Sequence, residues 1–135
     1  MIDHLILNKK ELSNYGSSLS LSEQMSCLLK QQYESWALLQ NNYKGLETVK
    51  IKSFNFDGFE VKVQFNPSRI TSSAAKVDDA SIKARKSFLH YNNLPPEQKG
   101  IVFNKEYLVL CNPYPIFNEH FTIPVINQSP QTIIG

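Results

Sequence analysis

The sequence has little of what marks several common functional classes. It contains only five glycines in 135 residues, and they stand apart, so neither a dinucleotide-binding fingerprint nor a phosphate-binding P-loop can be traced. Its three histidines show no His-x-His or His-x-x-x-His spacing, and no serine lies in a Gly-x-Ser-x-Gly elbow. As a generic pattern, therefore, the sequence contains no catalytic constellation, and we expect neither a cofactor nor a metal site.

Long apolar runs and clusters of basic residues are also missing. No apolar run approaches the roughly 18–20 residues that cross a bilayer, and the one near the N-terminus is too short for a signal peptide. The 14 lysines and arginines are spread along a chain whose net charge is only +2, whereas nucleic-acid binding usually needs a clustered basic face. We therefore expect no membrane partner and no nucleic-acid partner.

Cysteine is scarce as well. The two cysteines, Cys27 and Cys111, lie far apart in the sequence and in apolar surroundings. Such cysteines are typical of buried free thiols in a reducing compartment, and a disulfide between them is the alternative. We expect free thiols, and hence a cytoplasmic protein.

The clearest element that is present is an amphipathic helix beginning at Ser20. Ser20 and Glu23 form a capping box, in which the serine oxygen accepts from the amide three residues on and the glutamate reaches back. A stripe with 3–4 spacing follows, interrupted only by Gln32, and Asn41, Asn42 and Gly45 end the helix. We expect the stripe to lie in the core; its members are Leu21, Met25, Leu28, Leu29, Trp36 and Leu39.

Residues 47–66 are typical of a β-hairpin. Asp57-Gly58 is a two-residue turn signal, because glycine tolerates a positive φ. After it, apolar residues alternate with polar ones, which predicts one buried face and one solvated face; the apolar positions are Phe59, Val61, Val63 and Phe65. On the incoming strand the alternation changes phase near Ser53, which predicts a β-bulge or a change of packing partner.

The segment after the hairpin contains small hydroxyl residues beside two cations, Arg69 and Lys76. Such residues could hold a phosphate through charge-assisted hydrogen bonds, and a plain surface loop with solvated charges is the alternative. Further on, residues 79–88 have helical character with a basic flank.

The stretch Tyr107–Pro124, YLVLCNPYPIFNEHFTIP, is the one around which the chain is organised. Two apolar runs, at 107–111 and 121–125, flank a connector rich in turn residues that includes Asn112 and His120. The pattern predicts two strands joined by a loop that presents polar groups at a strand end. Binding residues are often found on such loops, because the strands hold the loop in place.

Three runs together resemble a known family: QFNPSR, AKVDDASIKARKSFLHYNNLPPEQKGI and YLVLCNPYPIFNEHFTIP. They resemble the N-terminal half of nucleotidyl-transfer enzymes of the histidine-triad superfamily, beside galactose-1-phosphate uridylyltransferase, diadenosine tetraphosphate phosphorylase and GDP-L-galactose phosphorylase. The resemblance covers roughly residues 24–131 and is best to bacterial members about twice as long. It implies an α+β fold, an antiparallel β-sheet with flanking helices, in which residues 1–19 are a lead segment and residues 20–135 half of a histidine-triad-like domain.

The resemblance also implies roles for four residues. Asn112 would contact the ribose or base of a nucleotide, Arg69 would contact phosphate, and Lys76 is a weaker phosphate candidate. His120 would have a structural role behind them, because the family's nucleophile comes from a later motif. The resemblance therefore implies that this chain binds a nucleotide or nucleotide sugar.

The chain departs from the family pattern in two places. The later motif, His-x-His-x-(His/Gln), which takes the nucleotidyl group covalently, is absent from this sequence. Ser87 and His90 stand where family members often have Cys-x-x-Cys, so zinc is not expected there. We expect a half-domain that is inactive alone, or that is completed by a C-terminal half on another chain. The alternative is a non-catalytic half-domain that forms a homodimer to cover an exposed sheet.

Overall fold

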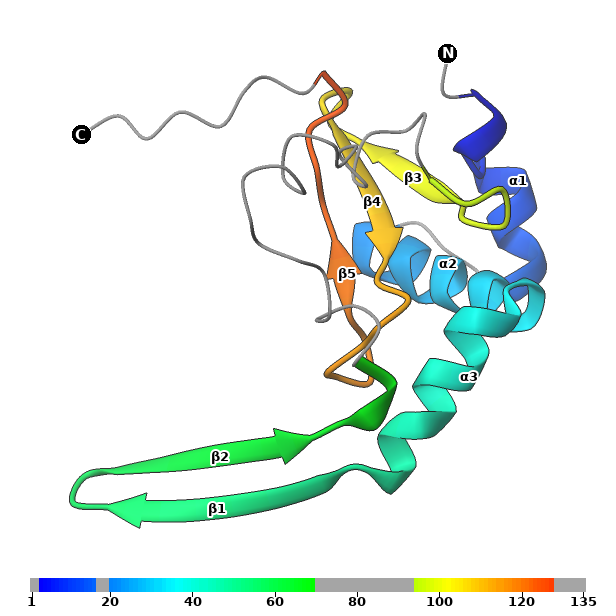
Figure 1. Cartoon of the computed structure of the whole chain (residues 1–135). Helices are drawn as coiled ribbons and strands as arrows, with labels where there is room; N and C mark the ends of the chain where they lie inside the picture. The colour runs from blue at the N-terminus through cyan, green and yellow to red at the C-terminus, as the bar shows by residue number, and fades with distance from the viewer. Residues whose placement is uncertain (1–2, 17–19, 70–93, 128–135) are drawn as a thin grey trace, which may run out of the picture.

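The computed structural model describes residues 3–16, 20–69 and 94–127, which contain three α-helices and five strands. The strands form two antiparallel sheets, the hairpin β1-β2 and the three-stranded sheet β3-β4-β5 (Figure 1). This arrangement confirms the predicted α+β class. The helices are α1 (Lys9–Leu12), α2 (Leu21–Ser35) and α3 (Ala37–Gly45), and the strands are β1 (Lys50–Phe56), β2 (Phe59–Phe65), β3 (Gly100–Phe103), β4 (Tyr107–Cys111) and β5 (Phe121–Thr122).

Some predictions fall on residues outside these ranges. They concern the helical character of residues 79–88, the phosphate candidate Lys76 and the Ser87/His90 pair.

The helix predicted from Ser20 is two helices. Ser20 caps α2 as predicted, because its Oγ accepts from the Glu23 N–H at 3.2 Å. The chain then leaves the helical conformation at Trp36, where φ is −125° and ψ is 100°, and α3 runs in a new direction (Figure 1). The bend places the Trp36 ring in the core beside Leu28 and Leu39. Leu28, Trp36 and Leu39 of the predicted stripe are buried in the core, and Met25 and Leu29 pack against it, whereas Leu21 is only half-buried and lies outside this cluster. The prediction of one continuous helix was wrong.

The main core lies between the helices and the three-stranded sheet (Figure 1). The N-terminal segment belongs to the same body, because the Leu7 N–H donates to the Gly100 carbonyl at 2.9 Å. Both cysteines are free and buried, as predicted, and burial raises the pKa of the Cys111 thiol to about 12. The buried cluster consists of Leu7, Leu12, Cys27, Leu28, Trp36, Leu39, Tyr43, Ile101, Val109 and Cys111.

Gln32, the residue that interrupts the apolar stripe, connects α2 to the segment before β3. Its side chain is fully buried. The Lys99 N–H donates to Gln32 Oε1 at 2.9 Å, and Gln32 Nε2 donates to the Glu97 carbonyl at 3.1 Å. Buried amide groups are generally hydrogen-bonded. Gln32 therefore interrupts the apolar stripe because its side chain joins α2 to the segment before β3 by specific hydrogen bonds.

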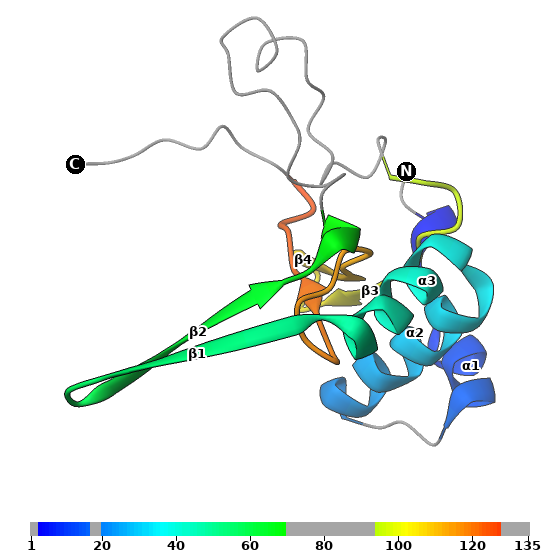
Figure 2. The same ribbon diagram turned by 60° about the horizontal axis from the view of Figure 1, so that its bottom comes forward.

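The hairpin forms with the predicted turn but without the predicted burial. Gly58 has φ +85°, as a two-residue turn requires. The register is continuous from Lys50 opposite Phe65 to Phe56 opposite Phe59, so the bulge predicted near Ser53 is wrong. The buried face is also wrong: apart from the half-buried Gln64, every residue of both strands is exposed. Figures 1 and 2 show why, since the hairpin projects away from the body as an arm.

Candidate functional site

The site is built on the loop from Asn112 to His120, which joins β4 to β5. Cys111 pairs with Phe121 across the two strands, and the Asn112 N–H donates to the His120 carbonyl at 2.8 Å. The antiparallel pairing therefore places Asn112 and His120 opposite each other at the base of the loop. The predicted strand–loop–strand in Tyr107–Pro124 is confirmed, although β5 itself is only two residues long.

Four successive carbonyl oxygens of the loop, from Pro113 to Ile116, each accept a hydrogen bond from a side chain. Two of the residues are prolines, which have no N–H to donate to a ladder, so side chains from elsewhere in the chain hold this backbone. In chain order of the carbonyls, the donors are Asn42 at 2.7 Å, Arg69 at 2.7 Å, Asn66 at 3.2 Å and Gln64 at 3.3 Å. The end of α3 and the end of β2 thus fix the loop's shape.

Arg69 is therefore close to the predicted nucleotide contacts, as its assignment as a phosphate contact requires. One guanidinium nitrogen, Nη1, is already committed to the Tyr114 carbonyl. A guanidinium has five N–H donors in a planar fork, and no other hydrogen bond of this group is seen within residues 3–16, 20–69 and 94–127. Arg69 thus holds the loop with one donor, and its other donors have no acceptor among the described residues.

Two hydrogen-bond donors face each other at the base of the loop. The Ile116 N–H donates to His120 Nδ1 at 3.1 Å, so Nδ1 carries a lone pair and the neutral ring has its proton on Nε2. The Tyr114 N–H donates to Asn112 Oδ1 at 2.8 Å, so the NH₂ end of this amide faces the ring. Asn112 Nδ2 and His120 Nε2 lie 3.4 Å apart, and two donors cannot bond each other.

We call these two atoms the donor pair. Within the described residues no acceptor pairs with either atom. Partial burial and the nearby positive charge of Arg69 both lower the pKa of His120, which favours the neutral ring; the hydrogen bond from the Ile116 N–H to Nδ1 leaves the ring proton on Nε2. The donor pair is thus arranged to receive an oxygen acceptor.

The backbone of His120 is held from α3. The His120 N–H donates to the Tyr43 hydroxyl at 3.1 Å, and that hydroxyl donates to the His120 carbonyl at 3.4 Å. The Phe117 ring lies edge-on to the imidazole, with 5.6 Å between ring centroids. The donor pair is therefore held on several sides.

A family model described as a domain of unknown function, DUF4922, matches residues 28–135. The chain belongs to this family. Neither a curated protein nor a solved structure matches the chain. The matched range contains Arg69, Asn112 and His120, so the donor pair and Arg69 lie inside the DUF4922 domain.

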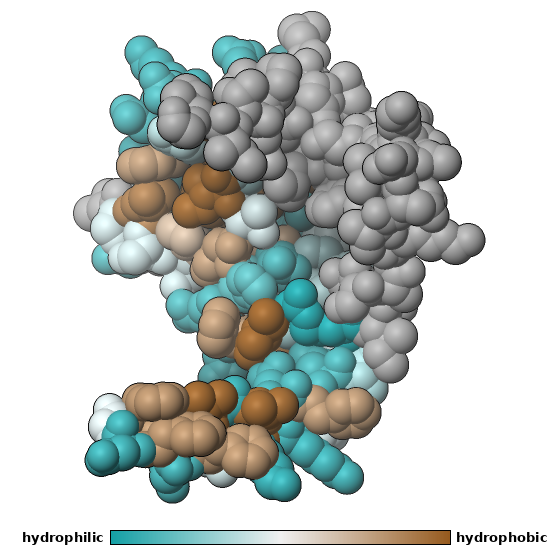
Figure 3. Space-filling model, turned by 60° about the vertical axis from the view of Figure 1, so that its left-hand side comes forward, coloured by the Kyte–Doolittle hydropathy of each residue, from teal (hydrophilic) through white to brown (hydrophobic). Residues whose placement is uncertain are grey.

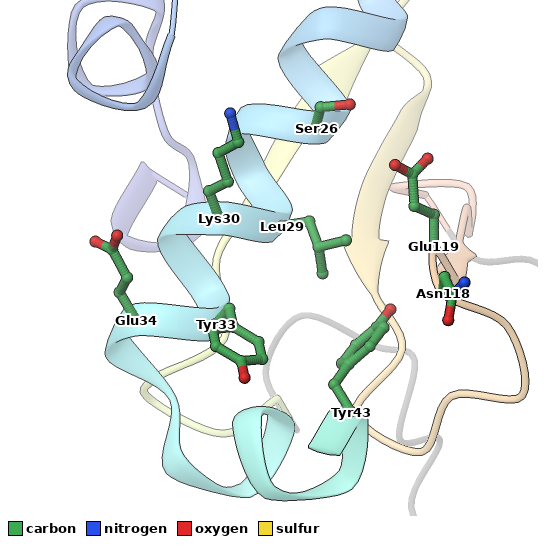
Figure 4. A pocket seen from close by; sticks show the side chains of 8 residues that line it. All are labelled: Ser26, Leu29, Lys30, Tyr33, Glu34, Tyr43, Asn118 and Glu119. Atoms are coloured by element: carbon green, nitrogen blue, oxygen red, sulfur yellow. The ribbon is translucent and has the colours of Figure 1, made fainter. Parts of the chain in front are cut away.

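A second feature of the DUF4922 domain is a shallow cleft of about 340 Å³ between α2, α3 and the loop (Figure 4). Leu29 and Tyr43 point into it, whereas Lys30 and Glu34 point away from its centre (Figure 4). Burial raises the pKa of the Tyr43 phenol, and its hydroxyl is engaged with His120. Other polar side chains also line the cleft, namely Ser26, Tyr33, Asn118 and Glu119. The donor pair is the better candidate, because its two donors lie together without an acceptor among the described residues.

In the described part of the chain, no three His, Cys, Asp or Glu side chains gather as a metal site would need. There, too, every helix is too short or too polar to span a bilayer.

Prediction from the sequence located Arg69, Asn112 and His120, and the structure brings these three together. It missed the side chains that hold the loop. Asn42 was assigned only as a helix end, and Gln64 only as a solvated strand position. Their partners lie 71 and 52 residues away, and no local pattern indicates contacts over such separations.

Proposed function

We propose that the chain binds a nucleotide or nucleotide sugar at the donor pair, with the Arg69 guanidinium beside it. The observation that supports the proposal is the pair of donors, Asn112 Nδ2 and His120 Nε2, 3.4 Å apart without an acceptor among the described residues. Ribose hydroxyls, phosphate oxygens and base carbonyls are all acceptors. In the proposed complex, one such ligand accepts from the donor pair and from Arg69. A hydrogen bond between a charged group and a ligand contributes about 1.5–3 kcal/mol.

The class of ligand rests on the histidine-triad resemblance, and the proposed activity is binding without nucleotidyl transfer by this chain alone. His120 is a poor nucleophile in its present state. Its Nδ1 accepts from the Ile116 N–H, and its Nε2 carries the ring proton, so neither nitrogen has a free lone pair. The family's own nucleophilic motif is absent from this sequence.

The sharpest test exchanges one donor for an acceptor. In Asn112→Asp, one carboxylate oxygen still accepts from the Tyr114 N–H, so the turn is kept. The other oxygen replaces the NH₂ group and accepts from His120 Nε2 within the protein. We expect the affinity for GDP, ADP or UDP-glucose, measured by calorimetric titration, to fall about tenfold or more.

Asn118→Asp is the matched control. Asn118 is exposed on the same loop, so this variant adds the same charge nearby without changing the donor pair, and it should keep most of the affinity. Equal losses in the two variants would point to a general charge effect and contradict the site. A wild-type chain that binds none of these nucleotides would overturn the proposal.

Arg69 is tested separately with ligands that have or lack phosphate. Arg69→Lys keeps the charge and loses the planar fork, which matches phosphate geometry best. We expect weaker binding of GDP and unchanged binding of guanosine. A loss that is the same for both ligands would assign Arg69 to loop structure alone.

A further inference from the structure

One face of the hairpin arm is apolar and uncovered. Directly paired residues in an antiparallel ladder share a face, so the register places the apolar residues of β1 and β2 together. Figure 3 shows the apolar side chains gathered along the arm. We call this the Phe/Val face; it consists of Phe54, Phe56, Phe59, Val61, Val63 and Phe65, each 40–61% exposed, with Lys50 and Lys52 on the same side.

The opposite face of the arm is different in character. It carries Ile51, Ser53, Asn55, Glu60, Lys62 and Gln64. Near the body, Gln64 on this polar face donates to the Ile116 carbonyl of the loop. At that point the polar face is turned toward the body, and the Phe/Val face is left without a cover from the described residues.

An arm of this kind needs something on its apolar face. A two-stranded hairpin alone in water is at best marginally stable. Contiguous exposed apolar patches of several hundred Å² usually mark an interaction site. The Phe56 and Phe59 rings stack at the tip, with centroids 5.1 Å apart, so the two rings present one continuous apolar surface there.

We propose that the Phe/Val face packs against the same face of a second copy of the chain, with the two arms antiparallel and related by a two-fold axis. In this arrangement each strand lies over its own counterpart and the tip of one arm covers the base of the other. Phe59 then meets the partner's Phe65, and Val61 meets the partner's Val63. Such self-complementarity is what an isologous interface requires.

The charges favour this arrangement. Along β1, Phe56 lies over the partner's Lys50 and Phe54 over the partner's Lys52, so no lysine opposes a lysine. Lys52 already lies over a phenyl ring in the single chain, with its ammonium 5.2 Å from the centroid of Phe54. Phenyl rings attract ammonium groups through their quadrupole. The antiparallel arrangement gives each face lysine a partner ring and keeps the two bodies at opposite ends.

The apolar area of the face is of the size expected for a weak, reversible dimer. With aromatic side chains of roughly 150–250 Å² about half exposed, the six apolar residues present about 500 Å² per copy. Two such faces together approach the roughly 1,000 Å² that a specific interface needs. The lysine stems and the contacts between each tip and the partner's body add to it.

The test is sedimentation velocity of the full chain over a range of concentrations, with a variant on each face of the arm. Phe59→Glu places a carboxylate at the tip of the arm, against the partner's Phe65 in the proposed interface, on a position that is exposed in the single chain. We expect the wild type to dimerise reversibly and Phe59→Glu to raise the dimer dissociation constant about tenfold or more. Circular dichroism confirms that the variant keeps its helices.

Ile51→Glu is the matched control, because Ile51 is an exposed apolar residue on the opposite face of the same arm. It should leave the dissociation constant unchanged. A second pair of variants reverses the charge of one lysine on each face of the arm. Lys52→Glu on the Phe/Val face should weaken the dimer, and Lys62→Glu on the polar face should not. A wild type that stays monomeric at all concentrations, or equal effects on both faces, would overturn the proposal. Neither outcome bears on nucleotide binding, because the donor pair lies outside the Phe/Val face.

Discussion

His120 shows how one residue can organise the loop between β4 and β5 through several hydrogen bonds. Its ring Nδ1 accepts from the Ile116 N–H, and its ring Nε2 lies beside Asn112 Nδ2. Its backbone N–H donates to the Tyr43 hydroxyl. The first contact requires an unprotonated Nδ1. Burial and the Arg69 charge lower the pKa of the ring and so preserve that state. The electrostatics and the hydrogen bonds therefore favour the same protonation state.

This predicts a dependence of stability on pH. Because the pKa of His120 is lower in the folded chain than in the unfolded one, where it is about 6.5, the unfolded state binds more protons below that value. The stabilisation is fully present above about pH 6.5 and is lost as the pH falls toward the folded pKa. We expect the free energy of unfolding in urea to decrease from pH 7.5 to pH 5.5.

His120→Asn isolates this contribution. The Asn Oδ1 can accept from the Ile116 N–H in place of Nδ1, but it does not titrate. The decrease between the two pH values should be smaller in the variant than in the wild type. Equal decreases would show that other groups cause the pH dependence.

At the scale of elements, the sequence predicted what depends on neighbours along the chain. The Ser20 cap, the Asp57-Gly58 turn and the two strands around the Asn112 loop all have short-range signals, and all form. It did not predict the break at Trp36, because the 3–4 spacing continues through that residue and only its burial in the core favours the bend. It also gave the hairpin a buried face, because alternation indicates an amphipathic strand but not what covers it.

The same limit applies to the candidate site. Asn112 and Arg69 were predicted from the family resemblance. The other side chains that hold the loop are far from it in the sequence, so no local residue pattern could identify them. The donors that hold the Pro113–Ile116 carbonyls come from α3 and from the end of β2. Only the folded chain brings them together, so the orientation of the donor pair had no local signal.

β3 illustrates an element whose first residue must be glycine. A Cβ at Gly100 would lie 2.9 Å from the Leu108 and Leu110 side chains and 2.9 Å from the Val109 carbonyl oxygen. The carbonyl belongs to the paired strand and cannot move away without breaking the sheet. We expect Gly100→Ala to lower the free energy of unfolding by about 1–3 kcal/mol, measured by urea denaturation.

Gly45→Ala is the control for this substitution. Gly45 ends α3 with φ −60°, and a Cβ there would meet Ser68 at an ordinary 3.6 Å. Alanine is also the better helix former, so this variant should be neutral or slightly stabilising. A comparable loss at Gly45 would contradict the steric explanation for Gly100.

At the scale of the whole molecule, the described residues form a body and an arm that differ in what holds them. In the body, helices and the three-stranded sheet share one core, and the N-terminal segment adds Leu7 and Leu12 to it. The arm extends from that body (Figure 2) and its two strands chiefly contact each other. The donor pair lies in the body and the Phe/Val face on the arm, so the proposed ligand binding and the proposed association can be tested separately.

This separation predicts how thermal stability responds to protein concentration. If two arms cover each other only in the folded state, association stabilises that state by mass action and the melting temperature rises with concentration. We expect such a rise for the wild type and for Ile51→Glu. Phe59→Glu should show a smaller rise over the same concentrations, because its arms pair more weakly while its body is unchanged. Calorimetry at several protein concentrations measures the melting temperatures of the wild type and the two variants. If the melting temperature of the wild type does not change with concentration, association through the arm does not stabilise the folded state.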